Sequence, residues 1–352
     1  MGRKSLKLLG VALFVLGLPV WAMADSISPS TFTGSGPTGA SYTVNKTVTI
    51  SAGAPTTSKV DVFFLADSTG SMGGAIANIK ASATSILSSA SGLGDVAFGV
   101  GEYKDVGDTF VYRTNTNISA SGAANVTAAQ AGINLWGASG GGDTPEANLY
   151  ALQQVASTTA WRTGSARILV WFGDAPGHDP SGPTAVTEAQ ATAALQASNV
   201  KVEALNVGFG GLNSTGQAGR IATATGGTLF SGISDADIVA AITAAITSAF
   251  DTYTTVSLDT SEVPAGVGIS VTPGSYTGSF DRSIDRTFGF EVTFTDREPG
   301  THVFNIYAAV DGGRVATESD SITSTTGVPE PGLLILLGAG LASLAGLRRK
   351  IK

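Results

Sequence analysis

Between residues 58 and 253, short apolar runs alternate with alanine-rich stretches whose apolar residues recur at helical spacing. The expected strands are 60–66, 96–103, 110–113, 167–173, 201–208 and 228–230, and the expected helices are 73–90, 124–133, 145–157, 187–198, 213–224 and 235–253. Continuous apolar runs such as ILVWF are typical of strands in a sheet that is covered on both faces. Strands separated by helices form parallel sheets with right-handed crossovers. The segment therefore predicts an α/β fold with a doubly wound, mostly parallel sheet.

The segments on either side of this α/β region have a different pattern. Residues 254–326 consist of short alternating runs broken by Gly, Pro and Asp, which predicts a smaller, antiparallel β-sandwich domain. Residues 25–57 are rich in Ser, Thr, Gly and Pro, and within them SYTVNKTVTI alternates as a strand does. This N-terminal β segment is a candidate further strand of the sandwich.

Composition limits the kinds of site that the chain can carry. The chain has 352 residues, a net charge of −7 and no Cys. The absence of Cys excludes disulfides and thiolate metal sites. Residues 25–347 contain no basic patch, which argues against nucleic acid as a partner.

The first 24 residues indicate export. Arg3, Lys4 and Lys7 precede an apolar stretch that ends in Ala22-Met23-Ala24. A basic region, an apolar region and a small-x-small site are the parts of a signal peptide, here cleaved after Ala24. An N-terminal membrane anchor is the alternative, although the apolar run is short for a membrane span.

The last segment, residues 327–352, has three parts in a fixed order. Pro329-Glu330-Pro331 is followed by an apolar stretch at 332–347 and then by the basic end RRKIK. The apolar stretch is just long enough to cross a bilayer, and the basic end predicts a cytoplasmic tail. This order resembles the PEP-CTERM sorting signal of Gram-negative bacteria. The resemblance implies processing by an exosortase and a mature protein in the envelope, on the cell surface or in the extracellular matrix. A plain tail anchor is the alternative.

The clearest chemical signal is ADSTGSMGG, which follows the first strand of the α/β region. Asp67 ends this strand, and Thr69 and Ser71 follow at alternate positions in a glycine-rich turn. Ligands gather at the carboxyl ends of strands in a doubly wound sheet. One carboxylate and two hydroxyls suit a hard cation such as Mg²⁺. The alternative is that the turn only caps a helix, with Ser71 as the N-cap residue.

Two further loops are expected at the same edge of the sheet. SGGGDTPEAN, at 139–148, carries Thr144 and Glu146, and ILVWFGDAPG, at 168–177, ends a strand with Asp174. Parallel strands present their carboxyl ends together, so we expect the three loops to converge.

At these loops the chain resembles a von Willebrand factor A domain, over about residues 58–253. The first loop matches the Asp-x-Ser/Thr-x-Ser signature of the metal-ion-dependent adhesion site. The resemblance implies a bound Mg²⁺, with Mn²⁺ or Ca²⁺ as alternatives. It implies that the cation is held, directly or through water, by Asp67, Thr69, Ser71 and Asp174. The second-loop ligand is Thr144, as in the integrin α type, or Glu146, as in the integrin β type.

The strand end GVGEYKD, at 99–105, also resembles the integrin β type. That resemblance implies a second, neighbouring metal position formed by Asp105, Asp143, the Pro145 carbonyl and Glu146. Gly141 stands where the integrin β pattern has another polar ligand, so turn formation is an equal alternative for the two aspartates. Integrin β chains also carry their A domain inside a β-sandwich.

Gly73 and Gly74 replace the acidic residues of a third, inhibitory integrin β site, which we expect to be absent. The two histidines, His178 and His302, are interpreted as structural residues. The chain has no Cys and no serine in a nucleophile-elbow context that would give either histidine a catalytic partner.

Together these patterns predict an exported adhesion or binding protein. An acidic group of a surface or matrix protein, or of a glycan, would complete the coordination of the cation. An enzyme is not predicted, because no second constellation of acid, base and nucleophile is visible. The alternatives are a structural matrix protein whose metal only stabilises loops and, less favoured, a metal-dependent enzyme.

Overall fold

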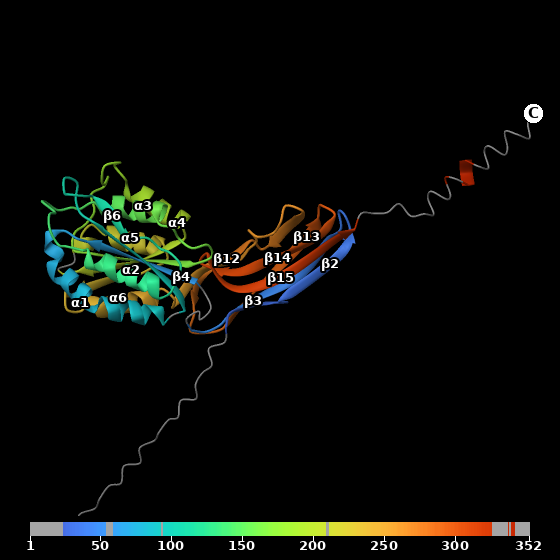
Figure 1. The fold of residues 1–352 in the computed structure, drawn as a ribbon, viewed down its shortest axis with the longest axis horizontal. Helices are drawn as coiled ribbons and strands as arrows, with labels where there is room; N and C mark the ends of the chain where they lie inside the picture. The colour runs from blue at the N-terminus through green and yellow to red at the C-terminus, as the bar shows by residue number, and fades with distance from the viewer. Residues whose placement is uncertain are drawn as a thin grey trace, which may run out of the picture.

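The computed structural model describes residues 24–53, 59–92, 94–208 and 211–325, together with Leu337 and residues 339–341. An α/β part and a β-rich part lie end to end along the long axis of the molecule (Figure 1). The predicted signal peptide up to Met23, the motif Pro329-Glu330-Pro331 and most of the predicted span at 332–347 lie outside the described residues. Within the described residues, no helix is both long and apolar enough to cross a membrane.

The α/β part is built on a six-stranded sheet, as the sequence predicts. Its strand order is β6-β5-β4-β7-β8-β9, and every neighbouring pair is parallel except β5 and β6. The strands are β4 (Lys59–Asp67), β5 (Asp95–Tyr103), β6 (Tyr112–Thr116), β7 (Ala166–Gly173), β8 (Val200–Val207) and β9 (Leu229–Ile233).

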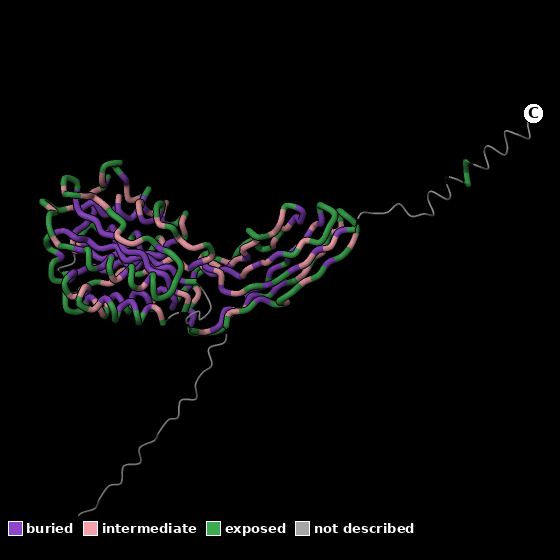
Figure 2. The backbone as a smooth tube through the Cα atoms, viewed as in Figure 1, coloured by how far each residue is buried: buried purple, intermediate pink, exposed green. Residues whose placement is uncertain are grey.

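Among the described residues, six α-helices cover the two faces of this sheet. The helices α1 (Gly73–Ser91), α2 (Ala123–Asn134) and α6 (Ile238–Ser248) share one core with the sheet. The helices α3 (Asn148–Thr158), α4 (Glu188–Ala197) and α5 (Gln217–Ala224) share the other core. Along β4, Val62 and Phe64 enter the first core, and Phe63 and Leu65 enter the second. Both faces of β4 are thus buried, which explains its continuous apolar run and its buried trace in Figure 2.

The β-rich part is a sandwich of two sheets. One sheet has the order β1-β3-β13-β11, and the other has the order β12-β10-β14-β15-β2. The strands are β1 (Ser26–Ser28), β2 (Thr31–Pro37), β3 (Ser41–Ile50), β10 (Thr252–Asp259), β11 (Val267–Thr272), β12 (Ser275–Asp281), β13 (Arg286–Asp296), β14 (Gly300–Val310) and β15 (Gly313–Thr325). All pairs are antiparallel except β2 and β15.

Strands from before and after the α/β part build this sandwich together. β3 pairs along its whole length with β13, and β2 pairs with β15. In Figure 1 the blue strands β2 and β3 lie beside the orange and red strands β13 to β15. The sandwich does not simply follow the α/β part in the sequence, because the α/β part is inserted between its third and fourth strands.

Several element boundaries differ from the sequence expectation, among them those of the last helix and of the edge strand. The last helix, expected to reach residue 253, ends at Ser248, and β10 begins at Thr252. Tyr253 and Val256 are buried in the sandwich core, so the alternating burial of a strand replaces helical spacing there. The strand expected at 110–113 lies at Tyr112–Thr116, as the antiparallel edge strand β6.

Candidate metal site

Asp67 ends β4 at the centre of the sheet and is fully buried. Its Oδ1 accepts hydrogen bonds from the Thr69 backbone N (2.9 Å) and from Thr69 Oγ1 (2.7 Å). Its Oδ2 is also buried, but no described residue donates a hydrogen bond to it. One carboxylate oxygen therefore orders the turn, and the other is available for a ligand.

Ser71 connects this first loop to the third. Its Oγ donates a hydrogen bond to Asp174 Oδ1 (2.9 Å) and lies 3.4 Å from Thr69 Oγ1. Asp174 directly follows β7, the parallel neighbour of β4, so the two strand ends share one edge. Ser71 does not cap α1, because the N-cap residue of that helix is Met72 and makes no side-chain cap hydrogen bond.

Glu146 brings the second loop to the same place. Its side chain is buried, and its Oε2 has no hydrogen-bond donor in the described part of the chain. Its backbone N donates to the Pro176 carbonyl (2.9 Å), and its carbonyl accepts from the His178 N (2.9 Å). These two bonds fix the second loop beside the third.

Gly141 lets Glu146 approach the first loop. Its φ is +71°, and a Cβ at this position would lie 2.8 Å from Glu146 Oε1 and 2.6 Å from Thr69 Cβ. A side chain at Gly141 would therefore separate Glu146 from Thr69. Gly141 thus has two consequences. It leaves the second metal position without one polar ligand, and it allows Glu146 to lie close to Thr69.

Thr144 lies differently from Glu146. Its side chain is exposed and makes no hydrogen bond within the described residues. Of the two second-loop candidates, the fold brings Glu146 to the cluster around Asp67 and leaves Thr144 in solvent.

The electrostatics of these carboxyl groups fit a cation. The pKa of Asp67 is raised to about 7, mainly by burial and in smaller part by the charge of Asp174, against the lowering effect of the Thr69 hydrogen bonds. The pKa of Glu146 is raised to about 8, mainly by burial and in smaller part by the charges of Asp67 and Asp105. Burial also raises the pKa of Asp174. Three carboxyl groups that oppose one another's ionisation, two of them with a buried oxygen lacking a donor, suit a divalent cation.

Lys104 holds the first two loops together, and the sequence pattern gave no indication of this role. Its buried Nζ contacts the carbonyl oxygens of Ser68 and Ser139, one from each loop. Its own carbonyl accepts a hydrogen bond from the Ala147 N (3.3 Å). Burial lowers the pKa of Lys104. Its position after a strand end was visible in the sequence, but its carbonyl partners depend on how two distant loops fold.

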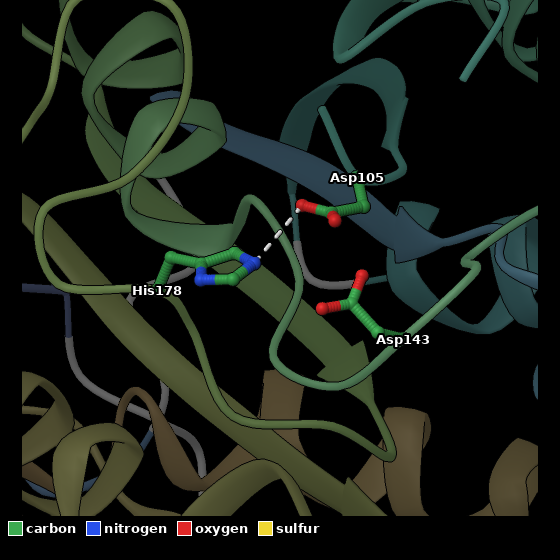
Figure 3. Close-up of side chains that lie close together, drawn as sticks. All are labelled: Asp105, Asp143 and His178. Carbon is green, nitrogen blue, oxygen red and sulfur yellow. Dashed lines mark ion pairs between the residues drawn. The ribbon is translucent and has the colours of Figure 1, made fainter. Parts of the chain in front are cut away.

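A second group of ligand atoms lies beside this site. One atom each from Asp105, Asp143 and His178 lies within 4.8 Å of the others. Asp105 is buried, and its Oδ1 lies 3.4 Å from His178 Nε2. Figure 3 shows the imidazole and the two carboxylates facing a common space. The two aspartates were expected to lie together, whereas the sequence pattern alone left His178 as a structural residue.

The other two residues expected at this second position, Pro145 and Glu146, are not members of this group. Glu146 is not one of the residues whose ligand atoms form this group. Pro145 follows a cis peptide bond in the same loop as Asp143.

Asp235, in the loop before α6, is a further carboxylate near the edge that the sequence pattern did not indicate. A Cβ on Gly74 would lie 1.9 Å from Asp235 Oδ2, so this glycine makes room for the carboxylate. The charge of Asp235 contributes to the raised pKa of Asp174.

The α/β part matches a family model. Residues 61–231 match the model described as von Willebrand factor A domain. No curated protein matches the chain.

Solved structures with a similar arrangement share little sequence with this chain. A von Willebrand factor type A protein from Catenulispora acidiphila is 14% identical, with 87% of this chain and 76% of that chain covered and a TM-score of 0.49. Proximal thread matrix protein 1 from the mussel byssus is 14% identical, with 59% and 48% covered and a TM-score of 0.44. The pilus adhesin SpaC from Lactobacillus rhamnosus GG is 12% identical, with 81% and 46% covered and a TM-score of 0.44.

This chain spans about half the length of the mussel and Lactobacillus chains. The mussel protein has also been solved with a zinc-occupied MIDAS motif. The identification of the α/β part depends on the family match, the sheet order and the converging loops. By these observations, residues 61–231 form a von Willebrand factor A domain.

Proposed function

We propose that this chain is an exported protein that binds a partner through a divalent cation at the carboxyl edge of its A-domain sheet. The observation that carries the proposal is a pair of buried carboxylate oxygens, Asp67 Oδ2 and Glu146 Oε2. Neither has a donor within the described residues, although they belong to loops that converge at one edge. Such oxygens are costly to bury unless a cation or a donor meets them.

The residues that would hold the cation follow from the hydrogen bonds of the three loops. They are Asp67, Thr69, Ser71, Glu146 and Asp174. Carboxylate and hydroxyl oxygens favour Mg²⁺, Mn²⁺ or Ca²⁺. When bound, the cation supplies a positive centre that a partner's carboxylate oxygen can reach. The partner would therefore be an acidic group of a surface or matrix protein or of a glycan.

A second cation beside the first is part of the proposal. Asp105, Asp143 and His178 would hold it, and the imidazole gives this position a preference for a transition metal such as Zn²⁺. It would neutralise Asp105 next to Glu146 and so support the second loop.

The binding function can be tested with the mature protein immobilised as bait. Envelope and matrix extracts would be passed over it with Mg²⁺, with EDTA, and with Asp67→Asn in place of the wild type. We expect partners that are retained only by the wild type with Mg²⁺ and that are displaced by an acidic peptide. Asp281→Asn, a carboxylate change in the sandwich, serves as the matched control.

Two outcomes would favour other functions. Identical retention under all conditions, with a melting temperature that still rises on addition of metal, would support a structural matrix protein whose metal stabilises loops. Metal-dependent turnover of a retained partner would support an enzyme and contradict the assignment as a non-enzyme.

We also propose that the protein is sorted through its C-terminal signal, with cleavage at or near Pro329-Glu330-Pro331. Mass spectrometry of the surface-exposed protein should place its C-terminus before Gly332. An intact C-terminus at Lys352 would contradict processing and support a plain membrane anchor.

A further inference from the structure

Three charged side chains occupy inward-facing positions in the sandwich core. Lys46 lies on β3, where the burial alternates and Val48 and Ile50 also face inward. Glu318 and Asp320 lie on β15 of the opposite sheet, two residues apart and on the same inward face. All three side chains are fully shielded from solvent. Apolar side chains are the usual occupants of such positions, so these charged residues need a specific explanation.

The three groups touch one another across the two sheets. Lys46 Nζ contacts Glu318 Oε1 and lies 3.4 Å from Asp320 Oδ2. It also lies 5.5 Å from the centre of the Phe294 ring, which belongs to the sandwich core. Glu318 Oε2 and Asp320 Oδ1 are buried without a donor from any described residue. The amine is therefore enclosed with two carboxyl groups among the apolar side chains of the sandwich core.

The carboxyl group of Glu318 favours its neutral form in this space. Its pKa is raised to about 8, first by burial and then by the Asp320 side chain, although Lys46 lowers it. A neutral carboxylic acid has an electrophilic carbon, whereas a carboxylate does not react readily with an amine. A desolvated lysine amine is likewise a competent nucleophile.

We propose that Lys46 and Glu318 condense to an intramolecular amide bond that links β3 covalently to β15. The Lys46 Nζ–Glu318 Cδ bond forms, and a Cδ–O bond of the carboxyl group breaks. Asp320 accepts a proton from Nζ and returns it to the departing hydroxyl, which leaves as water. The products are one amide and one water molecule, so no oxidant or other reactant is needed.

Two physical effects favour this reaction inside the fold. The sandwich holds the amine and the carboxyl group in contact, which replaces a bimolecular encounter by an intramolecular one. The reaction also removes a buried amine, whose charged form is costly to keep away from water, and leaves a neutral amide.

The first test is the mass of the purified full-length mature protein, compared with the mass calculated from its experimentally determined termini. We expect the wild type to be lighter by one water molecule. We also expect Lys46→Arg, which keeps the positive charge but cannot form this amide, to have the full mass. A full mass for the wild type would overturn the proposal.

A loss of water elsewhere must be distinguished from this one. Asp311-Gly312 is a sequence that can lose water by forming a succinimide, and such a loss would persist in Lys46→Arg. Persistence of the lower mass in that variant would overturn the proposal.

Fragmentation of the digested wild-type protein gives the site directly, even if the variants fail to fold. A branched peptide that joins Lys46 to Glu318 would support the proposal. A branch from Lys46 to Asp320 would overturn the assignment of Glu318 as the acyl donor. Asp320→Ala should slow the reaction and leave a fraction of full mass after expression, and complete crosslinking in this variant would overturn the role of Asp320.

Discussion

Ser71 Oγ donates a hydrogen bond of 2.9 Å to Asp174 Oδ1, which joins two loops that lie 103 residues apart in the sequence. The contact follows from the sheet, because β4 and β7 are parallel neighbours that end at the same edge. The hydroxyl and the carboxylate thereby fix each other next to Asp67. The contribution of each loop residue to metal binding can therefore be measured by single substitutions.

Replacing Asp67 by Asn should have opposite effects on metal binding and on the metal-free protein. Loss of the charge should weaken Mg²⁺ binding by roughly tenfold or more, or about 1.4 kcal/mol. It should also raise the melting temperature in EDTA, because burial disfavours the charged form of Asp67. Calorimetric titration and thermal unfolding measure the two effects. Unchanged affinity, or the same effects in Asp281→Asn, would show that Asp67 is not a ligand.

Glu146→Gln and Thr144→Val separate the two candidates in the second loop. Both changes preserve the size of the side chain. Since Glu146 is buried at the site and Thr144 is exposed, Glu146→Gln should weaken Mg²⁺ binding by roughly tenfold, the usual scale for losing a supporting contact at a metal site. Thr144→Val should change it little. A larger effect of Thr144→Val would identify Thr144 as the ligand.

The two histidines provide a matched pair for the second metal position. His178→Gln should abolish a Zn²⁺ binding event that is seen in the wild type, because the imidazole is the nitrogen ligand beside Asp105. His302→Gln should retain this event, since His302 lies in the sandwich with its Nε2 3.2 Å from the Glu298 carbonyl. Titration with Zn²⁺ in the presence of saturating Mg²⁺ measures this. Equal Zn²⁺ binding by both variants would exclude His178 as a ligand.

Lys104→Met should destabilise the A domain and loosen its metal loops. The change removes the charged donor of the buried Ser68 carbonyl, which keeps the Ser139 N as a donor (3.1 Å), and of the carbonyl of exposed Ser139. The loss should cost on the order of 1–3 kcal/mol in total. Urea unfolding should show the lower stability, and the affinity for Mg²⁺ should fall as well. Lys59→Met, at an exposed position on β4, is the control and should behave as the wild type.

Glu203→Gln should show a pH-dependent gain in stability. Burial raises the pKa of Glu203 from its usual 4.5 to about 7, so the folded state binds its proton more tightly than the unfolded state. The free energy of unfolding of the wild type therefore falls as the pH rises from about 4.5 to about 7, and it stays lower above that range. The stability difference between variant and wild type should grow by on the order of 2–3 kcal/mol between pH 4.5 and pH 8. A difference that does not vary with pH would contradict the raised pKa.

The α/β sheet and the first metal loop could be predicted because local patterns specify them. The apolar run of β4 requires a strand with two covered faces, and Asp67 necessarily follows it. The role of Lys104 could not be predicted, because its partners are carbonyl oxygens whose positions depend on two other loops. The role of Gly141 could not be predicted either, because it depends on the Thr69 and Glu146 side chains that lie against this glycine in the folded chain.

The N-terminal strands show another limit. β3 was visible from its alternation, but β1 and β2 are short or rich in Ser, Thr and Gly, and their pairing partners lie elsewhere in the chain. Their strand conformation depends on those partners rather than on local preference.

The inserted position of the A domain also imposes an order on folding. Thr43 of β3 meets Thr293 of β13, which is 250 residues later in the chain. All strands and helices of the A domain lie within this interval, so that domain can form while the sandwich still lacks its last strands. Pairings over such distances are slow to form, and unpaired strand edges invite aggregation in the meantime. The many Ser, Thr and Gly residues of β2 and β3 lower that hazard, because unpaired strands with few apolar side chains associate less readily with other chains.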